Sequence, residues 1–298
     1  MTLLFECVHR GERHVGLGMP GPGDPLHLYP VKDLDLRAAV TAADGDGAAL
    51  AAALTRGEEP VVVPAGERAQ VTMRPPLLPA SVGDAMVSGF MQTHNVKVDA
   101  GTQAQPNWFL KGLGDVLKVS GDELRVPAGA VSVTEEAEVV LVYVTDEAGA
   151  ARYAGYTFGN DLTDIGRFRQ HNGHLSYAKL CDAAVAPWLF LGPPPASVTG
   201  EVTIERAGRE AWRAGFSTGT DAMHYRIADI LPGLFAHRAL LHPGRVHYVY
   251  LGADRSSFHG GFRIADGDRV TLDFAEHGVV VSNTIDWPGA AAASPVER

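Results

Sequence analysis

Residues 134–179 read TEEAEVVLVYVTDEAGAARYAGYTFGNDLTDIGRFRQHNGHLSYAK, and the run at 139–144 within them decides the fold of this part of the chain. That run, VVLVYV, is apolar and rich in β-branched residues, which is typical of a β-strand. Glu136 and Glu138 stand directly before it. Because residues two apart in a strand point to the same face, we expect the two glutamates to project together.

Asp161 adds a third acidic side chain to this pair. Residues 152–158 (RYAGYTF) predict a second strand, and we expect Asp161 in the loop that follows it. Carboxylates that converge from two strands would form a hard oxygen-ligand site, suited to Mg²⁺ or Mn²⁺ rather than to zinc. A structural explanation stays open, because a glutamate pair at a strand start is usually solvated and Gly159-Asn160-Asp161 is turn-forming sequence.

The composition is that of an ordinary globular protein, with 298 residues of which 46% are apolar and 20% charged. This length suffices for one large domain or for a small and a large one. The net charge of −10, without any basic block, argues against a nucleic-acid partner. We expect no membrane span and a cytoplasmic protein, because the apolar runs are short and residues 1–13 do not resemble a signal peptide. Cys7 and Cys181 form neither a disulfide framework nor a cysteine-rich zinc site.

The first part of the chain indicates a separate unit. Segments 3–8 and 14–17 predict a hairpin, and the alanine-rich segment 34–54 predicts two helices with a turn between them. Prolines at positions 75, 76 and 79 then indicate a linker. We therefore expect a small N-terminal α/β domain over residues 1–78 and a second domain over residues 79–298.

The second domain is expected to consist mainly of short strands. Apolar segments such as 86–91 and 246–251 predict strands, and glycine-rich turns separate them. Helices are expected within 170–186, the segment that carries Lys179, and over 223–235. Many short strands with few helices indicate the α+β class, with a mixed and rolled β-sheet.

Several short motifs occur in the order in which one known superfamily carries them. They are SGFMQTH at 88–94, PNWFLKG at 106–112, EEAE at 135–138, AGYTFGND at 154–161, YAKL at 177–180 and ADGDRV at 265–270. On these motifs, residues 80–287 resemble the fumarylacetoacetate hydrolase superfamily. Segments 200–223 and 242–268 are similar to its GguC-type branch, which is linked to sugar-acid catabolism.

This resemblance implies a fold, a metal and a class of substrate. It implies a small N-terminal domain, a β-roll catalytic domain, a homodimer, and Mg²⁺ or Mn²⁺ bound by Glu136, Glu138 and Asp161. Members of the superfamily act on 2-keto acids or 1,3-dicarbonyl compounds, so a small 2-keto acid is the expected partner. Such a substrate can chelate a divalent ion through its carboxylate and keto oxygens, and the ion then stabilises an enolate.

The resemblance also assigns further site residues. Lys179 matches the active-site lysine, which can neutralise the substrate carboxylate or the enolate oxygen. His94 matches the lid histidine, which can act as a base. Substrate contacts are expected from Lys111, Arg255 and Ser256. Structural explanations stay open here too, since Lys179 could be a surface lysine and His94 a turn or core residue.

Two departures from the superfamily pattern bear on the reaction. Many acylpyruvate hydrolases carry a glutamate three residues after the histidine, whereas Lys97 stands here and would make His94 a weaker base. The Thr-Gly-Thr segment that often holds the substrate carboxylate is Leu-Gly-Ala at 251–253. We therefore expect first a metal-dependent lyase that dehydrates a 2-keto-3-deoxy (sugar) acid through a metal-stabilised enolate. The alternatives are a Mg²⁺-dependent C–C bond hydrolase of an acylpyruvate or diketo acid, and a non-catalytic relative that binds a keto acid.

Overall fold

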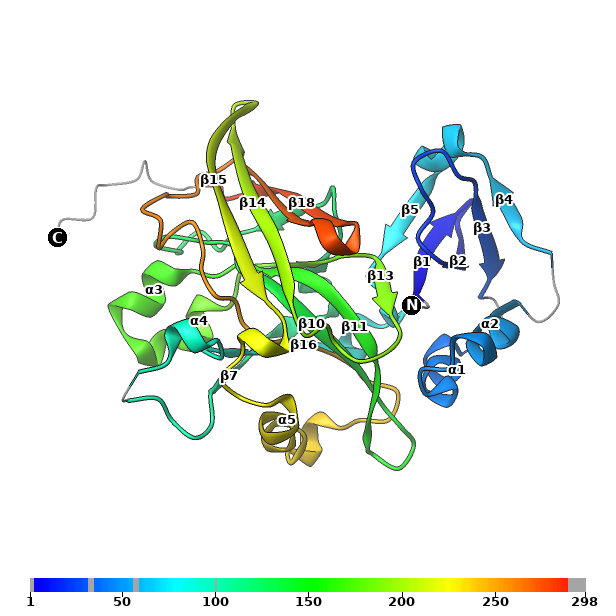
Figure 1. Cartoon of the computed structure of the whole chain (residues 1–298), viewed down its shortest axis with the longest axis horizontal. Coiled ribbons are helices and arrows are strands. Elements are labelled where there is room, and N and C mark those ends of the chain that lie inside the picture. Colours follow the sequence, from blue (N-terminus) through cyan, green and yellow to red (C-terminus); the bar gives the residue numbers. More distant parts are fainter. Residues whose placement is uncertain (1–2, 32–34, 56–58, 100, 289–298) are drawn as a thin grey trace.

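The computed structural model describes residues 3–31, 35–55, 59–99 and 101–288. Within these ranges the chain forms two β-sheets and short helices (Figure 1). The mixed sheets with few helices confirm the expected α+β class. Among the described helices, none combines the length and the apolar character that crossing a membrane requires.

The larger sheet contains thirteen strands in the described part of the chain. They are β1 Leu3–His9, β2 Glu12–Leu17, β3 Leu26–Pro30, β4 Val61–Val63, β5 Val71–Arg74, β6 Ala85–Met91, β7 Asn107–Leu113, β8 Leu117–Lys118, β10 Ala137–Thr145, β11 Ala151–Asp161, β12 Ala183–Val185, β13 Trp188–Phe190 and β16 Val246–Tyr250. The smaller sheet consists of β9 Glu123–Arg125, β14 Val198–Arg206, β15 Arg209–Thr218, β17 Arg269–Phe274 and β18 Val279–Asp286. The helices are α1 Leu36–Ala43, α2 Gly47–Thr55, α3 Ile165–Gln170, α4 Leu175–Ala178 and α5 Ile227–Phe235.

Strand β10 runs through the larger sheet between β11 and β16. All its residues are buried, and its side chains alternate between two cores. Val139 and Leu141 belong to the core shared with the smaller sheet, whereas Val140 and Val142 belong to the core that contains residues of α1 and α2. Burial on both faces explains why this strand is continuously apolar in sequence rather than alternating.

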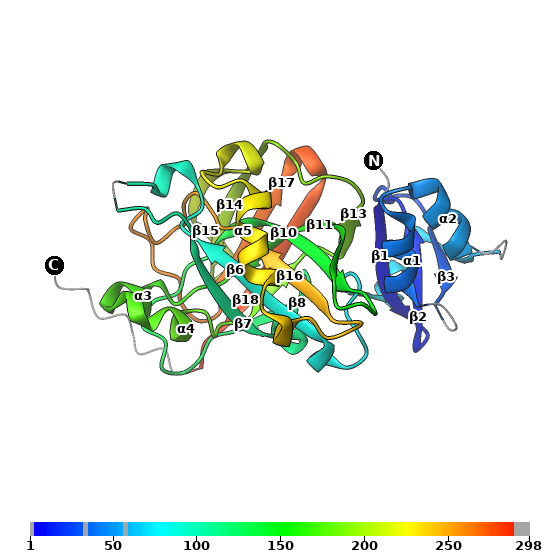
Figure 2. The ribbon, with the colours of Figure 1, turned by 90° about the horizontal axis from the view of Figure 1, so that it is seen from below.

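The first five strands, together with α1 and α2, form a small lobe beside the rest of the chain (Figures 1 and 2). Strands β1 and β2 form the predicted hairpin, and both residues of its turn have positive φ. Strand β1 also pairs with β13, with Leu3 opposite Phe190, which joins the lobe to the larger sheet. Leu77, in the proline-rich segment, is buried and donates its backbone N–H to Glu6 (2.6 Å). This segment therefore packs against β1. The expected limit between the two domains, at residue 78, remains a prediction.

One expected boundary near the acidic stretch is wrong. Asp161 does not lie in a loop, because it is the last residue of β11 and pairs with Ala183 of β12. The segment 170–186 is partly helical, as expected. It contains α4, Lys179 follows this helix as its C-cap, and the segment then extends into β12. The pairing of β11 with β12 is a contact that neither segment reveals alone.

Two other helices differ at their beginnings. The helix expected over 223–235 begins at Ile227, because Met223 is held in an isolated bridge with His94. The predicted start of the alanine-rich helical segment, Leu34, lies outside the described residues. Helix α1 begins at Leu36, where the side chain of Asp35 caps it.

Candidate metal centre

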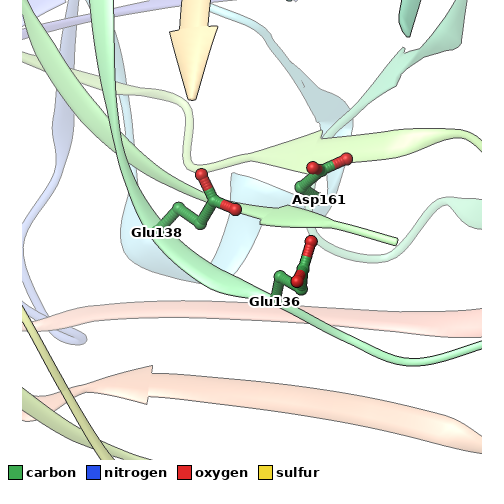
Figure 3. Close-up of side chains that lie close together, drawn as sticks. All are labelled: Glu136, Glu138 and Asp161. Atoms are coloured by element: carbon green, nitrogen blue, oxygen red, sulfur yellow. The ribbon is translucent and has the colours of Figure 1, made fainter. Parts of the chain in front are cut away.

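Three carboxylates come together where β10 begins and β11 ends (Figure 3). Glu136 precedes the first residue of β10, Glu138 lies within that strand, and Asp161 ends β11. One oxygen from each side chain lies within 4.8 Å of the others. Glu136, Glu138 and Asp161 are 6%, 1% and 0% exposed. The two glutamates therefore project together as their spacing predicted, and they are buried rather than solvated.

The pairing of β10 with β11 sets these positions. Asp161 donates its backbone N–H to the carbonyl oxygen of Glu136 (3.0 Å), so the two residues lie opposite one another. Glu138 lies opposite Gly159, on the same face of β11 as Asp161. A Cβ atom at position 159 would lie 2.4 Å from the carbonyl oxygen of Ala184. Glycine at this position lets β12 approach the strand that carries Asp161.

Neutral groups hold two of the carboxylates in place. Glu138 Oε2 accepts the backbone N–H of Gly252 (2.5 Å), and Glu136 Oε2 accepts the hydroxyl of Thr163 (2.9 Å). The side-chain oxygen of Asn160 accepts the backbone N–H of Glu136 (3.1 Å). These contacts restrict the orientation of the carboxylates before any ligand arrives.

Two buried lysines lie against the same carboxylates. Lys179 donates from Nζ to Glu136 (2.8 Å), to Thr163 (2.7 Å) and to Asp161, and its ammonium lies 4.3 Å from the ring centroid of Phe109. Lys111 donates to Asp161 Oδ1 (2.7 Å) and to the carbonyl oxygen of Leu162 (2.6 Å). Both lysines are buried, so neither is a surface residue.

The charges of this cluster shift each other's pKa values. Burial alone would raise the pKa of Glu136, but Lys179 and Lys97 lower it to about 2. Burial raises the pKa of Glu138 well above its usual range, and Asp161 and Glu136 raise it further. Burial alone would lower the pKa of Lys179, but Asp161 and Glu136 raise it above its usual value. A further positive charge nearby would therefore stabilise the ionised form of Glu138.

The donor set fits a divalent metal ion. Three carboxylates against two ammonium groups leave a net charge of −1 when all are ionised. Among the described residues, Glu138 has no ammonium partner within ion-pair distance. Buried carboxylate oxygens are the ligands that Mg²⁺ and Mn²⁺ prefer. Such an ion would supply the positive charge that Glu138 lacks.

A cavity of about 640 Å³ opens onto two of the carboxylates, Glu136 and Glu138. Its other polar lining includes Lys97, Arg255, Ser256 and His259, so two predicted substrate contacts, Arg255 and Ser256, do face it. Its apolar lining includes Phe90, Met91, Val96, Ile165, Phe168 and Trp212. The cavity can therefore take a small molecule with one charged and one apolar end.

The structure places the other predicted residues around this cavity rather than in its lining. Lys179 and Lys111 are buried against the carboxylates to which they donate, and neither belongs to the described lining of the cavity. His94 is 1% exposed and also absent from that lining. Its ring nitrogens lie 3.1 Å from the hydroxyl of Thr93 and 3.0 Å from that of Thr218.

The segment after β16 contains cavity residues that the local sequence pattern did not single out. His259 lines the cavity, and its Nδ1 lies 3.0 Å from the hydroxyl of Ser256. Glu135 is buried and accepts hydrogen bonds from the backbone N–H and the hydroxyl of Ser257. The signals were present as the sequence RSSFHGG and the acidic residue beside Glu136. Their meaning depends on a contact between residues far apart in the chain.

Comparisons with known proteins give matches among solved structures. A structure of 2-keto-3-deoxyarabinonate dehydratase has a TM-score of 0.69 at 15% identity, over 96% of this chain and 99% of that one. The 2-keto-3-deoxy-D-arabinonate dehydratase complexed with magnesium and 2,5-dioxopentanoate has a TM-score of 0.66 at 17% identity, with the same coverage. For 5-carboxymethyl-2-hydroxymuconate delta-isomerase from Mycobacterium smegmatis these values are 0.60 and 17%, over 96% and 99% of the two chains. No protein-family model and no curated protein matches the sequence.

These likenesses extend over nearly the whole chain, so they establish its fold. The fold is that of fumarylacetoacetate hydrolase superfamily structures, as the sequence resemblance implied. The chain therefore combines this fold with a buried acidic cluster that could bind a divalent metal ion. Identities of 15–17% establish a shared fold, but they do not assign the activities of these neighbours to this chain.

Proposed function

We propose that this chain is a divalent-metal-dependent lyase of the fumarylacetoacetate hydrolase superfamily, which dehydrates a 2-keto-3-deoxy acid such as a sugar acid. The observation that carries the proposal is the buried cluster of Glu136, Glu138 and Asp161 beneath a cavity of small-molecule size. A dehydratase with the same fold is complexed with magnesium and 2,5-dioxopentanoate, which supports the same type of reaction here.

The residues of the site have different proposed roles. Glu136, Glu138 and Asp161 would hold Mg²⁺ or Mn²⁺. When bound, this ion polarises the substrate keto oxygen and stabilises the negative charge that develops there during enolisation. Lys179 is proposed as the catalytic lysine, which balances the charge of Glu136 and Asp161 and of the enolate.

Other side chains would bind the substrate. Arg255 and Lys97 line the cavity and provide positive charge for the substrate carboxylate, with Ser256 as a hydrogen-bond donor. Lys111 was predicted to contact the substrate directly. Its position behind Asp161 supports a different role, in which it fixes the Oδ1 atom of that ligand.

The environment of His94 favours dehydration over hydrolysis. Burial, and then Lys97, lowers the pKa of His94 to about 4, although Glu136 acts in the opposite direction. Such a histidine is neutral at pH 7 but is a weak base for activating water. The Mg²⁺-dependent C–C hydrolase, with His94 as its base, is therefore the second candidate. It is supported by the apolar lining of Phe168 and Trp212, which suits the acyl chain of an acylpyruvate.

The test is the mass of the products formed by the purified protein. We would incubate it with Mg²⁺ and a panel of 2-keto-3-deoxy acids and acylpyruvates, with and without a chelator. A chelator-sensitive product that has lost one water supports the lyase. Two fragments that together have gained one water support the hydrolase. Metal binding without any product from the whole panel would contradict both and favour a keto-acid-binding role.

A variant connects the activity to the acidic cluster. Glu138→Gln keeps the shape of the side chain but removes a negative charge, so metal binding and turnover should both be lost. Glu147→Gln, at an exposed position, is the matched control and should bind and react as the wild type does. A fully active Glu138→Gln protein would contradict the assignment.

The predicted homodimer and the predicted cytoplasmic location both remain predictions. Light scattering of the purified protein tests the homodimer.

A further inference from the structure

His259 and Ser256 form a pair on the wall of the cavity. Ser256 Oγ lies 3.0 Å from His259 Nδ1, and both residues line the same cavity as Glu136 and Glu138. Within the described residues, no hydrogen bond engages His259 Nε2. A histidine that is held at Nδ1 and open at Nε2 has the arrangement of a group that exchanges protons with a bound molecule.

The segment that carries this pair is anchored to Glu135 and Glu138, on either side of Glu136 in the sequence. The carboxylate of Glu135 accepts the backbone N–H of Ser257 (2.7 Å) and its hydroxyl. Gly252, at the start of the same segment, donates its N–H to Glu138. The segment that carries His259 is therefore held, at Gly252 and Ser257, relative to the proposed metal ligands.

His94 lacks this accessibility. Both of its ring nitrogens face threonine hydroxyls, and its side chain is buried outside the cavity lining. His259 instead has an exposed side chain in the lining itself. Of these two histidines, only His259 belongs to the described lining of the cavity where a substrate would lie.

We infer that His259 is the acid–base residue of the proposed dehydration and that Ser256 is its positioning residue. This inference rests on the proposed function. His259 Nε2 takes a proton from C3 of the 2-keto-3-deoxy acid, and the electron pair of that C–H bond forms the enolate. The C4–O bond then breaks, a C3–C4 double bond forms, and the same proton passes from Nε2 to the departing hydroxyl as water. The step consumes no other reactant and returns His259 to its neutral form.

The charges around His259 agree with a neutral starting form. Burial, and then Lys97, lowers the pKa of His259, while Glu136 raises it and Arg169 lowers it. The net direction is downward, so the imidazole is neutral and able to accept a proton at pH 7.

The experiment follows proton exchange at C3 separately from loss of water. Wild-type protein, His259→Gln, His259→Ala and Ser256→Ala are mixed with Mg²⁺ and a panel of 2-keto-3-deoxy acids in deuterated water. Nuclear magnetic resonance then reports deuterium at C3 and the dehydrated product. Calorimetric titration with Mn²⁺ alone measures metal binding. His237→Gln is the control, because it changes an exposed histidine outside the site.

We expect His259→Gln to lose at least about 100-fold in both exchange and dehydration. Its Mn²⁺ binding should be unchanged. Imidazole added to His259→Ala should restore part of the rate, which a structural role would not allow. Ser256→Ala should lower kcat and shift the pH profile, because the orientation and basicity of His259 change. It should also raise KM, because the hydrogen bond from Ser256 to the substrate is lost.

Two results would overturn the inference, and they differ from one another. Wild-type rates in His259→Gln, with the wild-type protein clearly active as a dehydratase, would remove His259 from the reaction and leave the proposed function standing. A wild-type protein that binds Mn²⁺ but neither exchanges nor dehydrates any acid of the panel would overturn the proposed function and the inference together.

Discussion

At the scale of single residues, Lys179 has an unusual position. It is buried, and its ammonium is shared by Glu136 and Asp161. We expect Lys179→Met to lower the free energy of unfolding by about 3–5 kcal/mol, because two buried carboxylates lose their common partner. Urea unfolding measures this, with Lys118→Met as a half-buried control. Equal stability of the two variants would contradict the role of Lys179 as the counter-ion of the cluster.

His247 provides a second residue-scale prediction, on pH. It is fully buried in β16, and burial, with a smaller effect of Arg245, lowers its pKa to about 4. In the unfolded chain its pKa is about 6.5. The folded state therefore binds this proton less readily, so its stabilising effect is complete above pH ~6.5 and is lost as the pH falls toward 4. The loss from this residue is about 3 kcal/mol at most.

The variant His247→Gln isolates that effect. Between pH 7 and pH 5, urea unfolding should show a smaller loss of stability for this variant than for the wild type. His237→Gln, at an exposed position, should lose as much as the wild type. Because the pKa of His94 is also lowered to about 4, His94 still titrates in the variant, and some pH dependence stays. Identical curves for wild type and His247→Gln would show that this histidine is not involved.

At the scale of elements, the conformation of the segment after β16 depends on Gly252. Gly252 has φ of +92°, and a Cβ atom there would lie 2.3 Å from Thr93 Oγ1. Gly252→Ala should displace the backbone N–H that Glu138 accepts and weaken Mn²⁺ binding by about 10–100-fold. Gly261→Ala is a matched control, because Gly261 has φ of +85° but its Cβ would meet nothing within 4 Å. Calorimetric titration measures the Mn²⁺ affinity of both variants, and equal affinities would contradict this account.

The elements near the site differ in how far the sequence predicts them. Strands β10 and β11 follow from the local pattern of β-branched and aromatic residues, and the two-residue spacing correctly predicts that Glu136 and Glu138 project together. The strand character of Asp161 depends instead on β12, which is distant in sequence. The contact between Glu135 and Ser257 joins residues 122 positions apart. No local periodicity contains such information, so the place of His259 in the same cavity as Glu136 could not be predicted from its sequence neighbours.

At the scale of the whole molecule, the fold depends on a burial pattern more than on residue identity. The neighbouring structures share 15–17% of their residues with this chain and still match it over 96% of its length. Many different apolar side chains can fill the two cores on either side of β10, provided that their size and position suit. The resemblance in short motifs was therefore sufficient to predict the fold.

The lysines behind the acidic cluster have one more consequence, which concerns how the protein exists without an ion. Lys179 and Lys111 pair with Glu136 and Asp161, so without an ion only Glu138 of the three carboxylates lacks an ammonium partner among the described residues. An incoming ion must share Glu136 and Asp161 with an ammonium that already occupies them. Such competition keeps the ion exchangeable, so catalytic capacity would follow the free concentration of divalent ions in the surrounding solution.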